Sequence, residues 1–181
     1  MTVSSELDRR FRDAAAASGD VDVAYDLTDT PIGELLLAST ESGLCSIEFR
    51  PDLDALARQF GRRVLRVRGK LDPVRRQLDE YFEHRREDFE LDIDLHATGF
   101  PRQVLDELAH VPYGTVSTYG ELARKVGRPN AARAVGGVMN RNPIPIVLPC
   151  HRIVGSNGSL TGYGGGLHVK EALLRLEGAR L

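Results

Sequence analysis

Short apolar runs separated by turn residues fill the first half of the chain. "VDVAYDL" (21–27), "GELLLAS" (33–39) and "GLCSIEF" (43–49) are split by "TDTPI" and "TESG". Because Pro, Gly and Ser punctuate these runs, the pattern predicts a meander of three strands. Alternating residues predict two further strands, "GRRVLRVRG" (61–69) and "DFELDIDLH" (88–96).

Two helices are expected among these strands. "DLDALARQFG" (52–61) has helical spacing and ends at Gly61, a residue that commonly stops a helix. "LDPVRRQLDEYFEHRR" (71–86) can be capped by Asp72, and Pro73 suits the first turn. The mixed Arg and acidic residues of the second helix are typical of a solvated face.

The second half of the chain has helical spacing instead. It predicts helices over 99–111, 117–127, 128–142 and 168–178. Ser117 or Thr118 can cap the second of these, and Gly127 ends it. The apolar faces are expected to be formed by Val104, Leu105, Leu108, Leu173, Leu174 and Leu176.

The change from strand-like to helical pattern falls near Ala97–Gly99 and predicts a domain boundary. The 181 residues are enough for two small domains. We expect an α/β (α+β) protein with an extension (1–20), an N-terminal sheet-and-helix domain (21–96) and a C-terminal, mostly helical domain (97–181). No apolar run reaches membrane-span length, and the charged N-terminus lacks the apolar core of a signal peptide, so a cytoplasmic location is expected.

Charge is distributed unevenly between the two halves. Residues 1–96 carry 14 Lys and Arg against 21 Asp and Glu, whereas residues 97–181 carry 10 against 5. Two short helices joined by "GRPN" resemble a helix-turn-helix, and one acid, Glu121, accompanies the basic residues around them. These basic residues are Arg124, Lys125, Arg128, Arg133, Arg141 and Arg152. The pattern fits a phosphate-binding surface or, equally, a helical hairpin with a solvated basic face.

The chain has two cysteines, Cys45 and Cys150. With no CxxC pair and five scattered histidines, no zinc-ligand spacing is present, so no metal is expected, and both thiols are expected to be reduced. Cys150 precedes His151, between the stiff segment "NPIPIVLPC" and the glycine-rich "GSNGSLTGYGGG". Neighbouring side chains on an extended chain point to opposite faces, which argues against a direct contact between the thiol and the imidazole.

Several segments together carry a family resemblance. "VPYGTVSTYGELA", "AARAVGGVMNRNP" and "PCHR", in this order, resemble the active-site region of the O6-alkylguanine-DNA alkyltransferases, also called methylated-DNA–protein-cysteine methyltransferases. The resemblance runs from about Gly99 to Glu177. Residues 21–96 fit the family's ribonuclease H-like N-terminal domain loosely. The resemblance implies direct-reversal DNA repair in one turnover, without cofactor or metal.

The resemblance also implies the catalytic residues. The thiolate of Cys150 takes the alkyl group from O6 of guanine and becomes a thioether, which has no good leaving group. His151 activates the thiol through a bridging water, and Glu177 orients His151. Tyr119 supplies a proton to the departing base. Whether O4-alkylthymine is also repaired is left open.

Contacts to DNA follow from the same resemblance. The partner is double-stranded DNA carrying O6-alkylguanine, bound through the minor groove with the damaged nucleotide rotated out of the duplex. Arg133 fills the gap in the stack, and the small residues Ala132, Ala134 and Gly136 permit close approach. From the residues alone, Arg133 would be assigned to a phosphate. The protein is expected to be a monomer, with cooperative assembly on DNA left open.

Five more residues are implied around the base. Asn142 holds the turn before the active-site segment, while Pro145, Tyr163 and Gly164 line the base pocket. The backbone carbonyls of Cys150 and Ile153 accept hydrogen bonds from the guanine amino group. Gly164 stands where many relatives have serine, which removes one contact to the base. Arg152 is expected to be structural.

Three other hypotheses compete with repair. A cysteine hydrolase using Cys150 and His151 requires an oxyanion hole and a direct contact between the two side chains. A non-catalytic DNA-binding protein retains the helix pair and has no need of Cys150. A globular protein with a buried structural cysteine is the third. The order and number of matching segments favour the alkyltransferase.

Overall fold

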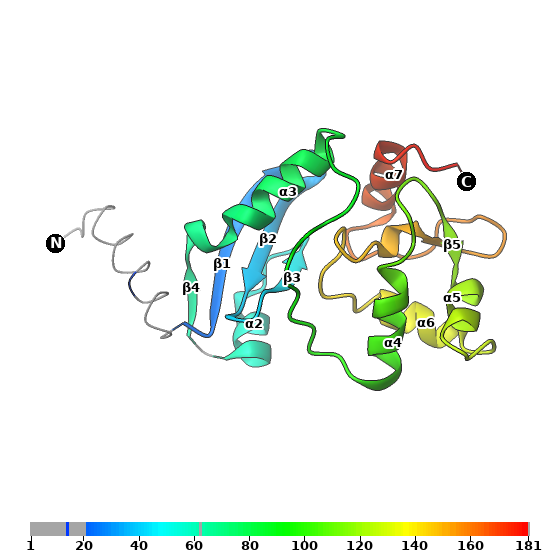
Figure 1. Ribbon diagram of the computed structural model, residues 1–181, viewed down its shortest axis with the longest axis horizontal. Helices are drawn as coiled ribbons and strands as arrows, with labels where there is room; N and C mark the ends of the chain where they lie inside the picture. The colour runs from blue at the N-terminus through cyan, green and yellow to red at the C-terminus, as the bar shows by residue number, and fades with distance from the viewer. Residues whose placement is uncertain (1–13, 15–20, 62, 181) are drawn as a thin grey trace. The chain divides into compact units, whose positions relative to one another are not determined.

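The computed structural model describes residues 14, 21–61 and 63–180, so the predicted extension over 1–20 lies, residue 14 apart, outside the described residues. The chain forms two compact units (Figure 1). The first includes the chain up to Glu83 together with Glu90–Asp94, and the second includes His84–Phe89 and the chain from Leu95 onward.

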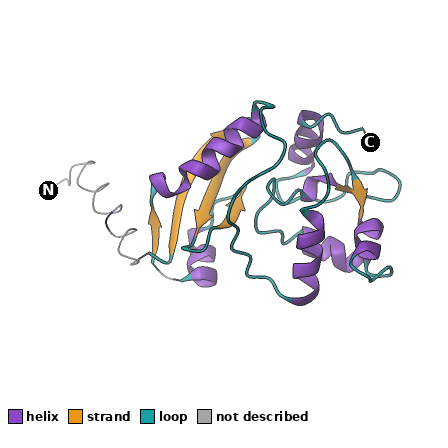
Figure 2. Ribbon diagram, in the orientation of Figure 1, coloured by secondary structure: helices purple, strands orange, loops and turns teal. Residues whose placement is uncertain are grey.

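The first unit is built on a four-stranded sheet (Figure 2). The strands β1 (Val23–Thr30), β2 (Gly33–Ser39) and β3 (Leu44–Glu48) pair antiparallel, which confirms the predicted meander. Strand β4 (Val64–Arg66) is shorter than predicted and lies parallel to β1, at the other edge from β3.

The prediction of a strand over 88–96 is wrong. This segment makes a single bridge to β3, between Ile93 and Leu44. At its start, the side chain of Gln77 captures both backbone groups of Glu90, donating to the carbonyl at 2.8 Å and accepting from the N–H at 2.8 Å. The N–H of Glu90 has a single hydrogen and donates it to Gln77, so it is not available to a neighbouring strand and the ladder does not extend there.

Helix α2 (Leu53–Phe60) covers one face of the sheet. Asp52 caps it by accepting from the N–H of Ala55 at 2.8 Å, and Gly61 ends it with a φ of 129°, in the region that favours glycine. Leu56 packs against a core formed by Val23, Leu36, Ala38 and Cys45. The Cys45 thiol is free and donates to the carbonyl of Ala38, while burial raises its pKa to about 12.

Helix α3 (Asp72–Phe82) covers the opposite face. The short 3₁₀ helix η1 (Arg68–Leu71) runs directly into it, so Asp72 is its first residue and the predicted Asp72 cap is wrong. The expected solvated face is also incomplete, because Arg75 donates to Asp26, a fully buried carboxylate in β1. Since Asp26 alternates along β1 with Tyr25 and Leu27, which pack on the α2 side, α3 lies on the other face.

The second unit is mostly helical. Its helices are α4 (Gly99–Leu108), α5 (Tyr119–Lys125), α6 (Ala132–Met139) and α7 (Leu167–Leu176), with a 3₁₀ turn η2 (Cys150–Arg152). Five of the six predicted core leucines and valines are buried, whereas Leu176 is half-buried. In the described ranges, no helix has the length and apolar character needed to cross a membrane.

A small sheet not expected from the pattern lies in the second unit. Strand β5 (Ser117–Thr118) pairs in parallel with β6 (Ile153–Val154). Of the two candidate caps for α5, the structure selects Thr118: it accepts from the N–H of Glu121, whose carboxylate accepts from the N–H of Thr118. This capping box fixes the start of α5, and therefore Tyr119, directly after β5.

Candidate functional site

A tight, buried turn leads the chain to Cys150. The Asn142 side chain closes it, donating to the carbonyl of Leu148 at 2.7 Å and accepting from the N–H of Ile144 at 3.1 Å. Ile146 is fully buried with a φ of 76°, which strains a β-branched residue. Burial of the apolar side chains and the two Asn142 hydrogen bonds offset this strain.

Cys150 begins the 3₁₀ turn η2 and is 5% exposed. Neighbouring residues in a 3₁₀ helix are about 120° apart, so the extended geometry assumed from the sequence does not apply. Burial raises the pKa of the Cys150 thiol to about 11, against the opposing effects of a hydrogen bond from Asn142 and the charge of Lys170. At neutral pH, roughly one molecule in 10⁴ carries the thiolate unless a base assists.

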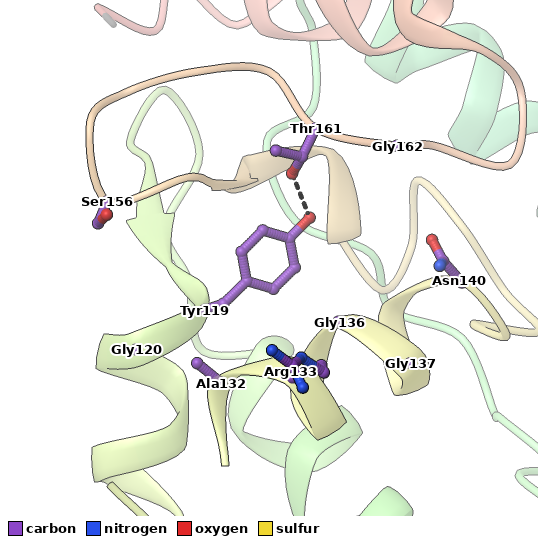
Figure 3. A pocket seen from close by; sticks show the side chains of 10 residues that line it. All are labelled: Tyr119, Gly120, Ala132, Arg133, Gly136, Gly137, Asn140, Ser156, Thr161 and Gly162. Atoms are coloured by element: carbon purple, nitrogen blue, oxygen red, sulfur yellow. Dashed lines mark hydrogen bonds between the residues drawn. The ribbon is translucent and has the colours of Figure 1, made fainter. Parts of the chain in front are cut away.

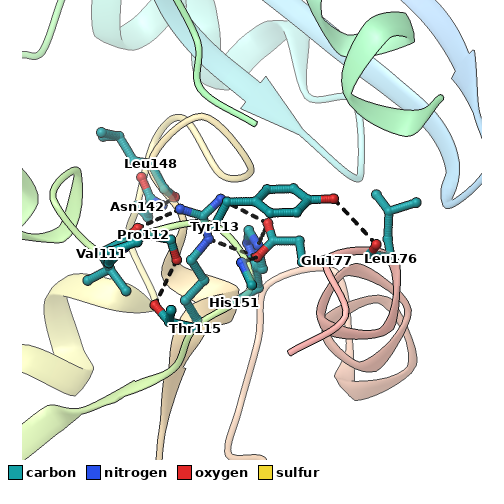
Figure 4. A network of polar contacts seen from close by, with 11 residues as sticks. Val111, Pro112, Tyr113, Thr115, Asn142, Leu148, His151, Leu176 and Glu177 are labelled. Carbon is teal, nitrogen blue, oxygen red and sulfur yellow. Dashed lines mark hydrogen bonds and ion pairs between the residues drawn. The ribbon is translucent and has the colours of Figure 1, made fainter. Parts of the chain in front are cut away.

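His151 is fully buried and bound to one partner (Figure 4). Its Nε2 lies 2.8 Å from Oε1 of Glu177. A carboxylate only accepts hydrogen bonds, so Nε2 carries the proton and Nδ1 is the basic nitrogen. Within the described part of the chain, Nδ1 has no hydrogen-bond partner. Burial lowers the pKa of His151, although the bond to Glu177 opposes this effect; the neutral imidazole is therefore a base ready to accept a proton.

Arg152 also binds the carboxylate of Glu177. Its Nε donates to Oε2 of Glu177 and its Nη2 to Oε1, each at 2.9 Å. Burial by itself would raise the pKa of Glu177, but the hydrogen bonds from His151 and Arg152 lower it to about 2. Arg152 also donates to the carbonyl of Val111. Its buried position removes Arg152 from the predicted phosphate-binding surface, and that part of the prediction is wrong.

Lys170 was missed from the sequence. It is fully buried on α7 and donates to the carbonyls of Ile153 at 2.6 Å and Thr161 at 3.1 Å. Burial lowers the pKa of Lys170, and the neighbouring Cys150 opposes this shift. Its place on the helix was a usable signal, because Lys170 precedes the core residues Leu173 and Leu174 by three and four positions and so shares their face.

The β5–β6 pair brings Tyr119 to the glycine-rich loop. Parallel strands end at the same edge, so Tyr119 after β5 and the loop after β6 emerge together. The Tyr119 phenol oxygen lies 2.8 Å from the hydroxyl oxygen of Thr161. The Tyr119 ring packs on α6 where Gly136 has no side chain: a Cβ there would lie 3.8 Å from the ring.

A pocket of about 670 Å³ opens between α5, α6 and the glycine-rich loop (Figure 3). It is lined by Tyr119, Gly120, Ala132, Arg133, Gly136, Gly137, Asn140, Ser156, Thr161 and Gly162. Three predicted DNA contacts, Arg133, Ala132 and Gly136, are therefore in its wall, and the fourth, Ala134, is exposed on the same helix.

The five residues expected around the base lie outside the lining of this pocket. None of Asn142, Pro145, Ile153, Tyr163 and Gly164 is among the residues that line this pocket. Pro145 and Ile153 are buried, Asn142 and Tyr163 are half-buried, and Gly164 is exposed. Their contacts to a base stay predictions.

The remaining basic residues of the helix pair are exposed. Lys125 forms an ion pair with Glu107 at 3.0 Å, and the Arg128 guanidinium lies 5.3 Å from the centre of the Phe100 ring. Arg124, Arg133 and Arg141 are also exposed. In the described ranges, no group of three or more His, Cys, Asp or Glu side chains is arranged to hold a metal ion.

Comparison with known proteins covers both units. Residues 99–179 match the DNA-binding domain of 6-O-methylguanine DNA methyltransferase, and residues 23–95 match the ribonuclease-like domain of the same family. The chain belongs to the 6-O-methylguanine DNA methyltransferase family. The loose resemblance of the N-terminal residues to this family is thereby confirmed.

Individual relatives agree with this assignment. The methylated-DNA–protein-cysteine methyltransferase of Methanosarcina acetivorans is 40% identical over 163 residues, covering 86% of this chain and 98% of the relative. That of Mycobacterium leprae is 42% identical over 149 residues, covering 82% and 88%. A crystal structure of Mycobacterium tuberculosis OGT in complex with DNA has a TM-score of 0.77 at 40% identity and covers 86% of this chain and 92% of that one.

Membership of the methyltransferase family separates DNA repair from two of the competing functional hypotheses. The family enzymes act on methylated DNA and accept the methyl group on a protein cysteine, as their name states. The prediction of a direct-reversal DNA repair enzyme is confirmed at this level, and the hydrolase and the globular protein with a structural cysteine are not supported. The role of each residue is a separate matter.

Proposed function

We propose that this protein transfers the alkyl group of O6-alkylguanine in DNA irreversibly to the sulfur of Cys150, once per molecule. The observation that carries this assignment is the buried series Cys150–His151–Glu177. It places an imidazole with a free Nδ1 directly after the thiol and fixes its other nitrogen at 2.8 Å from a carboxylate. No other cysteine in the chain is followed by a histidine.

The proposed reaction uses each residue once. His151 takes the thiol proton of Cys150 at Nδ1, through an intervening water, and Glu177 stabilises the imidazolium that forms. The sulfur then attacks the alkyl carbon, a sulfur–carbon bond forms, and the bond from that carbon to O6 breaks. Tyr119 gives its phenol proton to the guanine ring as the electron pair moves onto the base. The product is a thioether and unmodified guanine.

The DNA contacts proposed for this reaction centre on the pocket beside Tyr119. We assign double-stranded DNA to the exposed face of α5 and α6, with the minor groove against Ala132, Ala134 and Gly136 and with Arg133 in the base stack. The damaged nucleotide would then leave the duplex toward Tyr119. The helix-turn-helix role of α5 and α6, the monomeric state, cooperative assembly and the cytoplasmic location belong to the same proposal, as does the division into domains 21–96 and 97–181.

Intact mass measurement tests the proposed transfer. The protein is mixed with a duplex containing O6-methylguanine, with excess duplex, and then digested for peptide mapping. We expect one methyl group in place of one thiol hydrogen, located on Cys150 and saturating at one per protein. Continued conversion of O6-methylguanine to guanine in the duplex after saturation would contradict a single-turnover reaction. Binding to the lesion without any change in mass would favour a non-catalytic damage sensor.

The pH dependence of transfer distinguishes a relay from a free thiolate. With a thiol pKa of about 11, an unassisted thiolate would give a rate that rises about tenfold per pH unit from pH 7 to 9. Because the pKa of His151 is lowered from 6.5, the imidazole is already a free base above that pH. We therefore expect a flat single-turnover rate from pH 7 to 9 at saturating DNA.

The variant His151→Gln tests whether His151 is the base that makes the rate independent of pH. It should lower the rate at pH 7 by about 10²- to 10⁴-fold and restore the rise with pH, since only the free thiolate remains. A wild-type rate that climbs tenfold per unit would show that His151 is not the base.

Gly136→Ala should separate stability from transfer. An alanine inside α6 stabilises the helix by about 0.5–1 kcal/mol relative to glycine, and the added Cβ meets the Tyr119 ring at an ordinary 3.8 Å. The methyl group, however, occupies the pocket wall where the base would lie. We expect a higher free energy of unfolding in urea and a transfer rate about tenfold lower. The rate is measured at saturating DNA, because Gly136 is also assigned to the minor-groove face and its substitution can change affinity for any duplex. An unchanged transfer rate at saturation would remove Gly136 from the base site.

A further inference from the structure

Thr161 faces Tyr119 across the pocket (Figure 3). The two residues are 42 positions apart in the chain, one in the glycine-rich loop and the other at the start of α5, yet their hydroxyl oxygens are 2.8 Å apart. This is a normal distance for a hydrogen bond between two hydroxyl groups. The bond is at the position where the phenol must act in the proposed reaction.

Both partners are held in place by separate elements. The carbonyl of Thr161 accepts from the buried ammonium of Lys170, which also bonds the carbonyl of Ile153 and so ties the loop to α7. Tyr119 follows the capping box of α5, and its ring rests on α6 at Gly136. Two hydroxyl groups fixed in this way lose little further entropy when they bond each other.

The chemistry of the pair gives the bond a direction during the reaction. A phenol has one proton, and a threonine hydroxyl can either donate or accept. When the Tyr119 proton moves to guanine, the phenol oxygen gains negative charge and can only accept from Thr161. A donor aimed at an atom where charge develops stabilises the transition state more than the ground state.

We propose that Thr161 is a positioning residue for alkyl transfer: its hydroxyl orients the Tyr119 phenol and donates to the phenol oxygen as the proton leaves for the base. This inference rests on the function proposed above. The protons balance, because His151 gains the one lost by the Cys150 thiol and Tyr119 loses one to guanine. Proton exchange with solvent afterwards returns His151 and Tyr119 to their starting forms.

Thr161→Val tests the inference with a side chain of the same shape and no hydroxyl. We expect its single-turnover rate on O6-methylguanine duplex to fall about tenfold, with affinity for the same duplex unchanged. Thr161→Ser retains the hydroxyl and should transfer at close to the wild-type rate. Ser159→Ala removes an exposed hydroxyl two residues away in the same loop, outside the pocket lining, and should have no effect.

A double-mutant cycle with Tyr119→Phe distinguishes an effect of Thr161 on the phenol from an effect on the structure of the glycine-rich loop. If Thr161 acts through the phenol, Thr161→Val has no further effect once the phenol hydroxyl is absent. A wild-type rate for Thr161→Val, or an equal loss in the Tyr119→Phe background, would overturn the inference while leaving the proposed function intact. Absence of methyl transfer by the wild-type protein would instead overturn the proposed function itself.

Discussion

Cys150→Ala should abolish methyl transfer from O6-methylguanine DNA while the protein still binds that DNA. The sulfur is the only atom of this side chain that can form the product bond, and alanine offers no nucleophile. Cys150 is small and 5% exposed, so the substitution costs about 1 kcal/mol of unfolding free energy and leaves the pocket intact. The measurements are intact mass after incubation and the dissociation constant for the lesion duplex.

Cys45→Ala is the matched control. Cys45 is also a buried free thiol, with a pKa raised by burial to about 12, but it lies in the sheet core of the first unit and bonds the carbonyl of Ala38. This variant should accept one methyl group at the wild-type rate. Methylation of the Cys150→Ala protein, or loss of methylation in the Cys45→Ala protein, would place the nucleophile elsewhere.

Glu177→Gln should cost both stability and rate. The carboxylate holds the buried guanidinium of Arg152 by two hydrogen bonds of 2.9 Å and stabilises His151 at 2.8 Å. Glutamine has nearly the same volume, but it leaves the Arg152 charge buried and unpaired, which costs about 3–5 kcal/mol. Without the negative charge, the imidazolium of His151 loses its stabilisation, and transfer should slow by about 10²- to 10⁴-fold.

A second substitution separates the two effects. In Arg152→Met/Glu177→Gln no unpaired charge remains, so much of the unfolding free energy should return. The transfer rate should stay low, since His151 still lacks a carboxylate. Glu171→Gln on the exposed side of α7, where Glu171 forms an ion pair with the exposed Arg175 at 2.9 Å, should change stability by about 0.5 kcal/mol or less. Recovery of full transfer by the double variant would show that Glu177 acts only through Arg152.

Acid unfolding provides an independent measurement on Glu177. Its pKa is about 2 in the folded protein against 4.5 for a free glutamate, so its ionisation stabilises the fold above pH 4.5. This contribution, about 3 kcal/mol, is lost as the pH falls from 4.5 toward 2. Glu177→Gln should therefore lose less stability than the wild type over that interval, and equal losses would contradict the low pKa.

Much of this molecule is determined by local sequence. The meander, the helices and their buried faces follow from apolar periodicity, because each depends on residues only a few positions apart. Asp52 and Thr118 each cap a helix by accepting from a backbone N–H three residues away. The segment around Cys150 and His151 likewise indicated the chemistry. The two adjacent residues, the glycine-rich loop after them and the basic helices before them all lie within one continuous part of the sequence.

The bonds that order the site were decided by tertiary structure. Arg152 and Glu177 are 25 residues apart, and Tyr119 and Thr161 are 42 apart, so no local pattern encodes either pair. From the sequence, Arg152 is one of several basic residues that could contact phosphate. In the folded protein it is buried beside the carboxylate of Glu177. The failed strand over 88–96 has the same origin: its alternation was right for a strand, but Gln77 took the backbone groups of Glu90.

The sequence by itself thus determined which segments form helices and most strands, and it indicated candidate residues for the chemistry, whose roles stay predictions. Only the folded chain decided which nitrogen of His151 meets Glu177, and that the hydroxyl of Thr161 lies against the Tyr119 phenol. The physical reason is that periodicity reports burial along one segment, whereas a hydrogen bond depends on the distance between two atoms brought together by the packing of several segments.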